Sequence, residues 1–186
     1  LVFTSFWLEY RLWGLAPFGY HLVNVLLHAA SAFLLWRILV RLGLRGAFLA
    51  AAIFAVHPIF VESVAWVTER KNVLSGFLCL ASFSFLWSHF HGVKSRAGHY
   101  TMALVLFLAA LLSKTVTSSM PAAFLVVSWF SGKKITKRMV ILLLPFFAAG
   151  IGLGMLTSYL EYNHVGARGP EAQVAFTNRL ITAGYV

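Results

Sequence analysis

The chain has 186 residues, of which 60% are hydrophobic and only 11% are charged, and its formal net charge is +10. Soluble domains contain about 45–50% apolar and about 25% charged residues, so this composition argues against a soluble globular domain, and it excludes a disordered chain. The basic residues are spread thinly between long apolar runs, which favours a membrane over a nucleic acid as their partner. The single cysteine, Cys79, excludes an intramolecular disulfide.

Six stretches of the chain are free of Asp, Glu, Lys and Arg. A membrane-spanning helix needs about 20 apolar residues, with a range of roughly 17–25. The six stretches approach that length and lack the alternation of a strand, so they predict helices: 12–36, 46–61, 72–93, 97–113, 115–132 and 139–160. The second stretch has only 16 residues, and a re-entrant segment is the alternative there. The sequence therefore predicts an all-α, polytopic membrane helix bundle with about six spans.

The fourth and fifth stretches are separated by a single charged residue, Lys114. One helix covering 97–132 would be about 54 Å long, which is too long for one crossing. The Ser and Thr residues that follow Lys114, and then Pro121, predict a helical hairpin instead. Lys114 at its turn either extends to lipid headgroups or provides a cation suited to a phosphate.

The segments that connect the six stretches differ in charge. One side of the membrane receives nine basic residues and no acid: Arg37, Arg41, Arg45, Lys94, Arg96, Lys133, Lys134, Lys137 and Arg138. The other side receives six basic residues and all five acids: Arg11, Arg70, Lys71, Lys114, Arg168, Arg179, Glu9, Glu62, Glu69, Glu161 and Glu171. By the positive-inside rule the first side is cytoplasmic, so every carboxylate is expected to face outward.

The segment 57–72 concentrates chemically active side chains on the outer side. Pro58 is expected to open a short amphipathic interfacial helix that carries Glu62, Trp66 and Glu69 on one face. Its carboxylates are either simply solvated or paired with arginine, or they are part of a site, since charges at membrane depth often mark one. The candidate residues of this segment are His57, Glu62, Glu69, Arg70 and Lys71.

Two other polar features lie outside that segment. Residues at helical spacing in the first stretch form a polar stripe, interpreted as a source of interhelical hydrogen bonds: His21, Asn24, His28 and Ser31. No zinc-type spacing occurs, so the residues themselves predict no metal site. In the polar tail 161–186, the spacing of Phe176, Leu180 and Ile181 predicts a second interfacial helix or the entry to another span, and Arg179 contacts either headgroups or the site.

Three strings of the sequence carry a family resemblance: YRLWGLAPFGYHLVNVLLH (10–28), HPIFVESVAWVTERKNVLS (57–75) and LLSK (111–114) before Pro121. They resemble the transmembrane and tetratricopeptide-repeat-containing O-mannosyltransferases, in particular their bacterial relatives, within the GT-C glycosyltransferase superfamily. The resemblance covers essentially the whole chain. It implies a GT-C-like fold and a polytopic enzyme that takes a sugar from a polyprenyl-phosphate donor and transfers it to a protein or another exported acceptor.

The resemblance also implies roles for individual residues. In this superfamily an aspartate in the first outer loop acts as general base, and cations, in some members with a divalent metal, stabilise the departing phosphate. Carried over by position, Glu62 and Glu69 would line the site, with His57 at its edge. The candidates for binding the donor phosphate would be Arg70, Lys71 and Lys114.

The chain departs from the family pattern in several respects. It contains no aspartate, it has no tetratricopeptide repeats, and Asn72 stands where some relatives carry an acid, which weakens a metal site. It begins without Met and ends in a polar stretch. We therefore expect residues 1–186 to be a partial transmembrane domain without the first outer loop and any C-terminal repeats, and to be inactive alone.

Two other classes of function remain open at this level. The chain is alternatively a non-catalytic membrane scaffold that anchors a repeat domain, or a transporter. A transporter places its polar groups near the bilayer midplane, whereas the acids here fall in the outer connections. The bacterial inner membrane is the expected location, with the ER membrane as the alternative, and neither a nucleic acid nor a soluble cofactor is expected.

Overall fold

The computed structural model describes residues 1–92 and 97–165, and within these ranges all regular structure is helical. The elements are α1 (Val2–Trp13), α2 (Pro17–Arg41), α3 (Ala47–Val56), η1 (Pro58–Phe60), α4 (Val61–Ala65), η2 (Val67–Glu69), α5 (Arg70–His91), α6 (Ala97–Ser113), η3 (Thr115–Ser119), α7 (Met120–Phe130), α8 (Lys137–Leu160) and the π-helical turn η4 (Glu161–Val165). The predicted all-α bundle is confirmed. The helix predicted near Phe176, and Arg179, lie outside the described residues.

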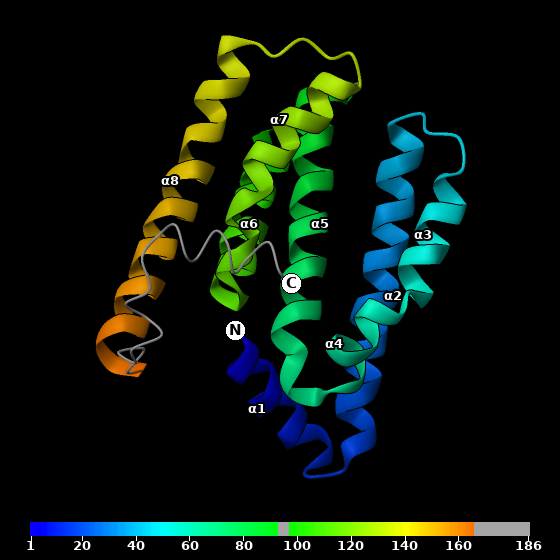
Figure 1. Cartoon of the computed structure of the whole chain (residues 1–186), viewed down its shortest axis with the longest axis vertical. Helices are drawn as coiled ribbons and strands as arrows, with labels where there is room; N and C mark the ends of the chain where they lie inside the picture. Colours follow the sequence, from blue (N-terminus) through cyan, green and yellow to red (C-terminus); the bar gives the residue numbers. More distant parts are fainter. Residues whose placement is uncertain (93–96, 166–186) are drawn as a thin grey trace, which may run out of the picture.

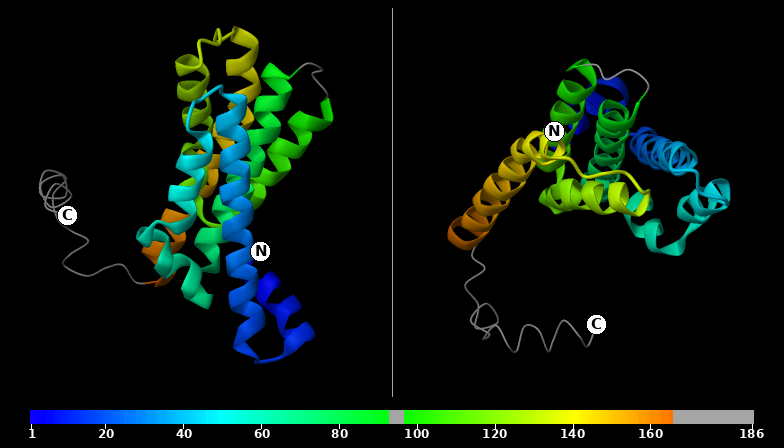
Figure 2. Two further views of the ribbon diagram at one scale, coloured as in Figure 1. Left: turned by 90° about the vertical axis from the view of Figure 1, so that its right-hand side faces the viewer. Right: turned by 90° about the horizontal axis from the view of Figure 1, so that it is seen from above.

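The long helices run alternately up and down the molecule, as Figure 1 shows. Helix α5 stands in the middle, with α2 and α3 on one side of it and α6, α7 and α8 on the other, and the view from above agrees (Figure 2). Helix α1 forms a short hairpin with the start of α2 at one end of the bundle. This end also holds α4 and the start of α5, so segments distant in sequence meet there.

Three helical segments of the described chain are long and apolar enough to cross a membrane: Pro17–Arg41, Val67–His91 and Lys137–Asn163. A fourth span results if Ala47–Val56 and Pro58–Ala65 are counted together, although the two are bent by 47°. The two remaining stretches form the shorter apolar helices of the predicted hairpin, α6 and η3–α7. All six stretches are thus helical, and six full crossings remain a prediction.

The hydrophobic core lies where α5, α6, α7 and α8 meet. The rings of Phe107 and Phe146 are both fully buried, with centroids 5.2 Å apart, and Phe83 contacts the buried Phe124 at 5.3 Å. Ser82 of α5 donates a hydrogen bond of 2.7 Å to the carbonyl of Ala103 in α6. In a bilayer, van der Waals packing and such interhelical hydrogen bonds hold helices together, so this half is the well-packed part of the molecule.

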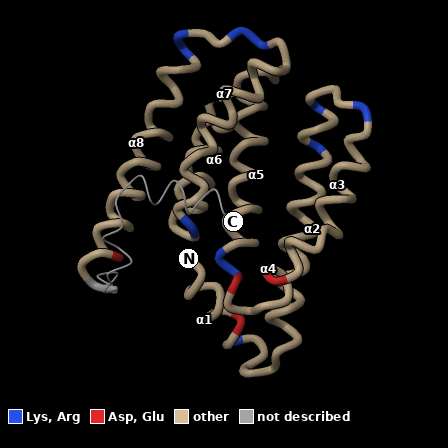
Figure 3. The backbone as a smooth tube through the Cα atoms, viewed as in Figure 1, with Lys and Arg blue, Asp and Glu red and all other residues tan. Residues whose placement is uncertain are grey.

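The charges of the described residues are segregated between the two ends of the bundle. Figure 3 shows only Lys and Arg at the end where α2 joins α3 and α7 joins α8, while the half that holds α1 and α4 carries all the described acids together with further Lys and Arg. The predicted partition is therefore confirmed for the described chain. Lys94, Arg96, Arg168 and Glu171 lie outside it.

Candidate functional site

The predicted interfacial helix in segment 57–72 is broken into three short pieces, η1, α4 and η2. Trp66 adopts an extended conformation (φ −83°, ψ 120°), which ends α4 and prevents a continuous helix. The side-chain amide of Asn24 in α2 donates to the carbonyls of Val64 (3.2 Å) and Trp66 (3.1 Å). The Trp66 carbonyl also accepts a bond of 3.1 Å from the Glu69 N–H, so Asn24 joins α2 to the bend without replacing its local backbone bonds. Glu62 and Glu69 consequently do not share one helical face.

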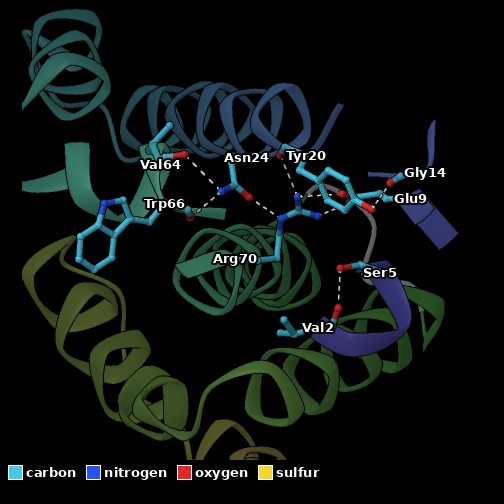
Figure 4. A network of polar contacts seen from close by, with 9 residues as sticks. All are labelled: Val2, Ser5, Glu9, Gly14, Tyr20, Asn24, Val64, Trp66 and Arg70. Carbon is cyan, nitrogen blue, oxygen red and sulfur yellow. Dashed lines mark hydrogen bonds and ion pairs between the residues drawn. The ribbon is translucent and has the colours of Figure 1, made fainter. Parts of the chain in front are cut away.

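Arg70, the first residue of α5, lies at the centre of a buried polar cluster (Figure 4). Its side chain is 0% exposed and forms a two-pronged ion pair with Glu9 of α1, in which Nη2 donates to Oε2 at 3.1 Å. Nη2 also donates to the carbonyl of Tyr20 at 2.9 Å, and Nε donates to Oδ1 of Asn24. The guanidinium lies 5.2 Å over the ring of Phe6. Its charge is thus compensated within the protein.

Sequence analysis missed this cluster because Glu9 was counted only as one of the outward-facing acids. Glu9 lies 61 residues from Arg70 in the sequence and is 5% exposed. A buried cation must be paired or change its protonation, and arginine does not lose its proton. A basic residue next to an apolar run indicates that an acidic partner is needed, but the sequence does not identify which acid is that partner.

Lys114 belongs to a second, more open group of polar side chains. Its Nζ donates to Oδ1 of Asn72, and Nδ2 of Asn72 donates to Glu69 Oε2 (2.6 Å) and to Ser63 Oγ (3.1 Å). Glu69 also pairs with Lys71 at 3.2 Å. The Lys114–Asn72–Glu69 chain therefore links the turn of the α6–α7 hairpin to the start of α5.

A hollow of about 510 Å³ adjoins this chain of hydrogen bonds. Its polar lining includes Ser63, Asn72, Lys114 and Thr117, together with His28 and Ser31 from α2. Its apolar lining includes Phe54, Phe60, Leu80 and Val116. The hollow thus joins a cationic end to an apolar wall, as a site for an amphiphilic anion requires.

Of the six predicted site residues, only Lys114 lines this hollow. His57 is exposed, accepts a 3.3 Å bond from the Ile59 N–H and lines a neighbouring hollow of about 330 Å³ with His21. Glu62 is exposed on α4, and Lys71 is exposed beside Glu69. The structure therefore connects Lys114, Glu69 and Lys71 through Asn72, holds Arg70 in a separate cluster, and leaves Glu62 and His57 outside both.

Two of the four residues in the polar stripe of α2, Asn24 and His28, make the interhelical contacts predicted for the stripe. Asn24 bonds to α4, Trp66 and α5, and Nε2 of His28 lies 3.1 Å from the Ala55 carbonyl of α3. Ser31 instead bonds within α2, to the carbonyl of Leu27. In the described residues, no group of three or more His, Cys, Asp or Glu is arranged to hold a metal ion.

Comparison with curated proteins connects the chain to named relatives. It is 36% identical over 116 residues to Protein O-mannosyl-transferase Tmtc1 of Drosophila melanogaster, covering 61% of this chain and 13% of that protein. It is 40% identical over 106 residues to Protein O-mannosyl-transferase Tmtc3 of the same fly, covering 45% of this chain and 11% of the relative. This chain is a relative of the TMTC protein O-mannosyl-transferases.

A third relative, Protein O-mannosyl-transferase F38B6.6 of Caenorhabditis elegans, is 31% identical over 124 residues, covering 64% of this chain and 17% of that protein. The chain thus spans between about a tenth and a sixth of the length of these three relatives. No family model matches the chain, and no solved structure matches it. The relatives and the apolar helices together establish an integral membrane protein.

Proposed function

We propose that this chain is part of a membrane glycosyltransferase, and that it binds the phosphate end of a polyprenyl-phosphate sugar donor. The names of its relatives support transfer of mannose or a similar sugar to a protein or another exported acceptor. The observation that carries the proposal is the Lys114–Asn72–Glu69 chain of hydrogen bonds beside the 510 Å³ hollow. The bacterial inner membrane is the proposed location, with the ER membrane as the alternative.

Lys114 is the cation best placed to receive the donor phosphate. A lysine ammonium has three donors, and Asn72 takes one, so others remain for phosphate oxygens. Asn72 is itself held by its bonds to Ser63 and Glu69, which fixes the position of the ammonium. Arg70, by contrast, already binds Glu9, and Lys71 is exposed at the edge of the group. We assign Lys71 a supporting role in attracting the phosphate.

The apolar wall of the hollow suits the isoprenoid chain of such a donor. The residues that line it are Phe54 of α3, Phe60 of η1, Leu80 of α5 and Val116 of η3. An isoprenoid chain would pack against these apolar side chains, while the phosphate would bind the polar side chains of the same hollow. Both parts of the donor thus find matching surfaces in one hollow.

The proposed reaction is a displacement at the anomeric carbon of the sugar. The acceptor hydroxyl attacks that carbon, the bond to the phosphate oxygen breaks, and the lipid phosphate leaves with the electron pair. Lys114 stabilises the charge that develops on the phosphate, and a carboxylate accepts the hydroxyl proton. Glu62 and Glu69 are proposed to line the site, with His57 at its edge, and the carboxylate that accepts the proton is proposed to come from the first outer loop. A divalent metal remains a prediction of the superfamily resemblance.

The chain contains no aspartate that could act as the family's general base. We therefore propose that residues 1–186 form a partial transmembrane domain, which needs a first outer loop from the longer protein for activity. This proposal predicts that the 186-residue chain alone transfers no sugar, whereas the full-length protein does. Sugar transfer by the isolated chain would contradict it.

The site assignment is tested in the full-length protein by replacing Lys114. We expect Lys114→Met to lower kcat/KM for a polyprenyl-phosphate mannose donor by about 10–100-fold, and Lys114→Arg to lower it less. Lys133→Met, a matched loss of one lysine at the opposite end of the bundle, should leave transfer unchanged. Unchanged transfer by Lys114→Met would overturn the assignment.

A second result separates the enzyme from the scaffold. If the folded full-length wild-type protein transfers no sugar from any polyprenyl-phosphate donor, the enzymatic proposal fails and the scaffold hypothesis replaces it. Cysteine replacements at Glu62 and Lys114, in a Cys79→Ser background, should both react with an impermeant thiol reagent from the same side of the membrane. Labelling from opposite sides would remove the proposed site altogether.

A further inference from the structure

Two adjoining hollows lie along α2, and the larger one is lined by the arginines near the basic end of that helix. One has a volume of about 390 Å³ and is lined by Phe33, Trp36, Arg37, Val40 and Arg41 of α2. The other has a volume of about 190 Å³, lies between α2 and α3, and has Phe33, Trp36, Phe48, Ala51, Ala52 and Ala55 in its lining. Phe33 and Trp36 line both hollows, so the arginine-bearing surface continues directly into the apolar groove.

The groove has a wall of aromatic rings and a floor of small side chains. Trp36 lies edge-on to Phe48 at 6.2 Å and to Phe33 at 5.8 Å. The three alanines of α3 project only a methyl group each, so a narrow apolar space remains between the helices. A hydrocarbon chain fits such a space, because it needs apolar contact along its length and no hydrogen bonds.

Among the described residues, Arg37 and Arg41 have no acidic partner. Arg37 lies 5.8 Å over the ring of Phe33, and the two ion pairs of the described residues involve Glu9 and Glu69 in the other half of the molecule. Arg41, one turn further on, is held beside it by bonds from Nη1 to Ser84 Oγ (2.8 Å) and Ser88 Oγ (3.3 Å). A negative charge at this point must therefore come from outside the described protein.

We infer that these hollows bind an anionic phospholipid of the leaflet at the basic end of the bundle. Its phosphate lies against Arg37 and Arg41, whose planar guanidinium groups match phosphate oxygens, and one acyl chain follows Trp36 and the alanines of α3. The anionic headgroup supplies the charge that the protein lacks there. This site does not depend on the proposed glycosyltransferase function, and its ligand is a bilayer lipid rather than a sugar donor.

Trp36 provides a direct readout, because bromine on an acyl chain quenches a neighbouring indole. The full chain is placed in phosphatidylcholine vesicles with rising fractions of brominated phosphatidylglycerol or brominated phosphatidylcholine, and the Trp36 signal is obtained by difference from Trp36→Phe. We expect the anionic lipid to quench Trp36 at a several-fold lower fraction than the neutral one. Equal quenching by the two lipids would overturn the inference.

Two variants show whether Arg37 produces the preference. Arg37→Gln should abolish it, since this exposed arginine provides the unpaired charge. Arg11→Gln is the matched control, because Arg11 also stacks over an aromatic ring, that of Trp7 at 5.1 Å, but belongs to neither hollow. A preference that persists in Arg37→Gln contradicts the proposed headgroup contact.

The acyl groove has its own test, which does not depend on fluorescence. Ala52→Phe fills the groove, whereas Ala123→Phe adds the same ring to an exposed position on α7. In native mass spectrometry, phosphatidylglycerol should remain bound to the wild type and to Ala123→Phe, and dissociate from Ala52→Phe. Retention by Ala52→Phe equal to that of the wild type would exclude the groove as the site of the chain.

Discussion

Two cations at the acid-bearing end of the bundle, Arg70 and Lys114, both lie next to apolar stretches in the sequence. Their surroundings in the structure differ. Arg70 is 0% exposed and binds Glu9, Asn24 and the carbonyl of Tyr20. Lys114 is half-buried, donates to the amide oxygen of Asn72 and lines an open hollow. The charge of Arg70 is compensated within the protein, whereas Lys114 has no acidic partner among the described residues and is the residue we propose for the ligand. Whether an acidic partner already compensates a cation is therefore better evidence about its function than how close the cation lies to a site.

The largest expected effect comes from separating Arg70 from its acid. Glu9→Ala leaves a fully buried guanidinium without a counter-charge, and breaking such a pair costs about 3–5 kcal/mol. Unfolding in mixed detergent micelles would measure the loss. Glu62→Ala, which removes an exposed carboxylate from α4, is the matched control and should change the free energy of unfolding by less than about 0.5 kcal/mol. Equal stability of the two variants would show that the buried pair is not a structural contact.

A smaller effect is expected from Asn24, which joins α2 to the start of α5 and to the bend at Trp66. Asn24→Ala removes the bonds to Arg70 and to the carbonyls of Val64 and Trp66, so we expect a loss of about 1–3 kcal/mol in the free energy of unfolding. Asn163→Ala removes one exposed bond to the Tyr159 carbonyl and serves as the control. Hydrogen exchange should also rise at residues 61–69 in Asn24→Ala. Unchanged exchange there would contradict the role of Asn24 in holding the bend.

The smallest effect on stability is expected for Lys114, even though its effect on transfer should be large. Lys114→Met leaves Asn72 with its bonds to Ser63 and Glu69, so the free energy of unfolding should fall by less than about 1 kcal/mol. The same unfolding measurement as for Glu9→Ala makes the comparison direct. A loss as large as that of Glu9→Ala would place Lys114 among the structural cations and remove the contrast between the two regions.

The helical content followed from the sequence because lipid allows few alternatives. A charge-free run in a bilayer has to satisfy its own backbone hydrogen bonds, so all six such stretches became helical. The hairpin turn at Lys114 was predicted for the same reason, since one helix over 97–132 is too long. The continuous helix expected in 57–72 was wrong, because Trp66 is extended, and Asn24 holds this bend from across the bundle by donating to the carbonyls of Val64 and Trp66.

The candidate site was predicted only in part. Lys114, Glu69 and Lys71 were singled out by their charge on the outer side, and the structure links them. Asn72 entered the sequence argument only as a departure from the family pattern, yet it is the residue that joins the others. Its role depends on α4, η2 and the turn after α6 meeting at the start of α5, and no local sequence pattern reveals that meeting.

The sequence alone determined that this is an apolar helical chain with its acids at one end, because hydrophobic length and charge placement act locally along the chain. The tertiary structure decided which cation is neutralised and which faces a hollow. Charges interact over a few ångströms in a low-dielectric interior, and α1 brings Glu9 to Arg70 across 61 positions of sequence. Glu9 and Arg70 come within ion-pair distance of each other only once the helices have packed.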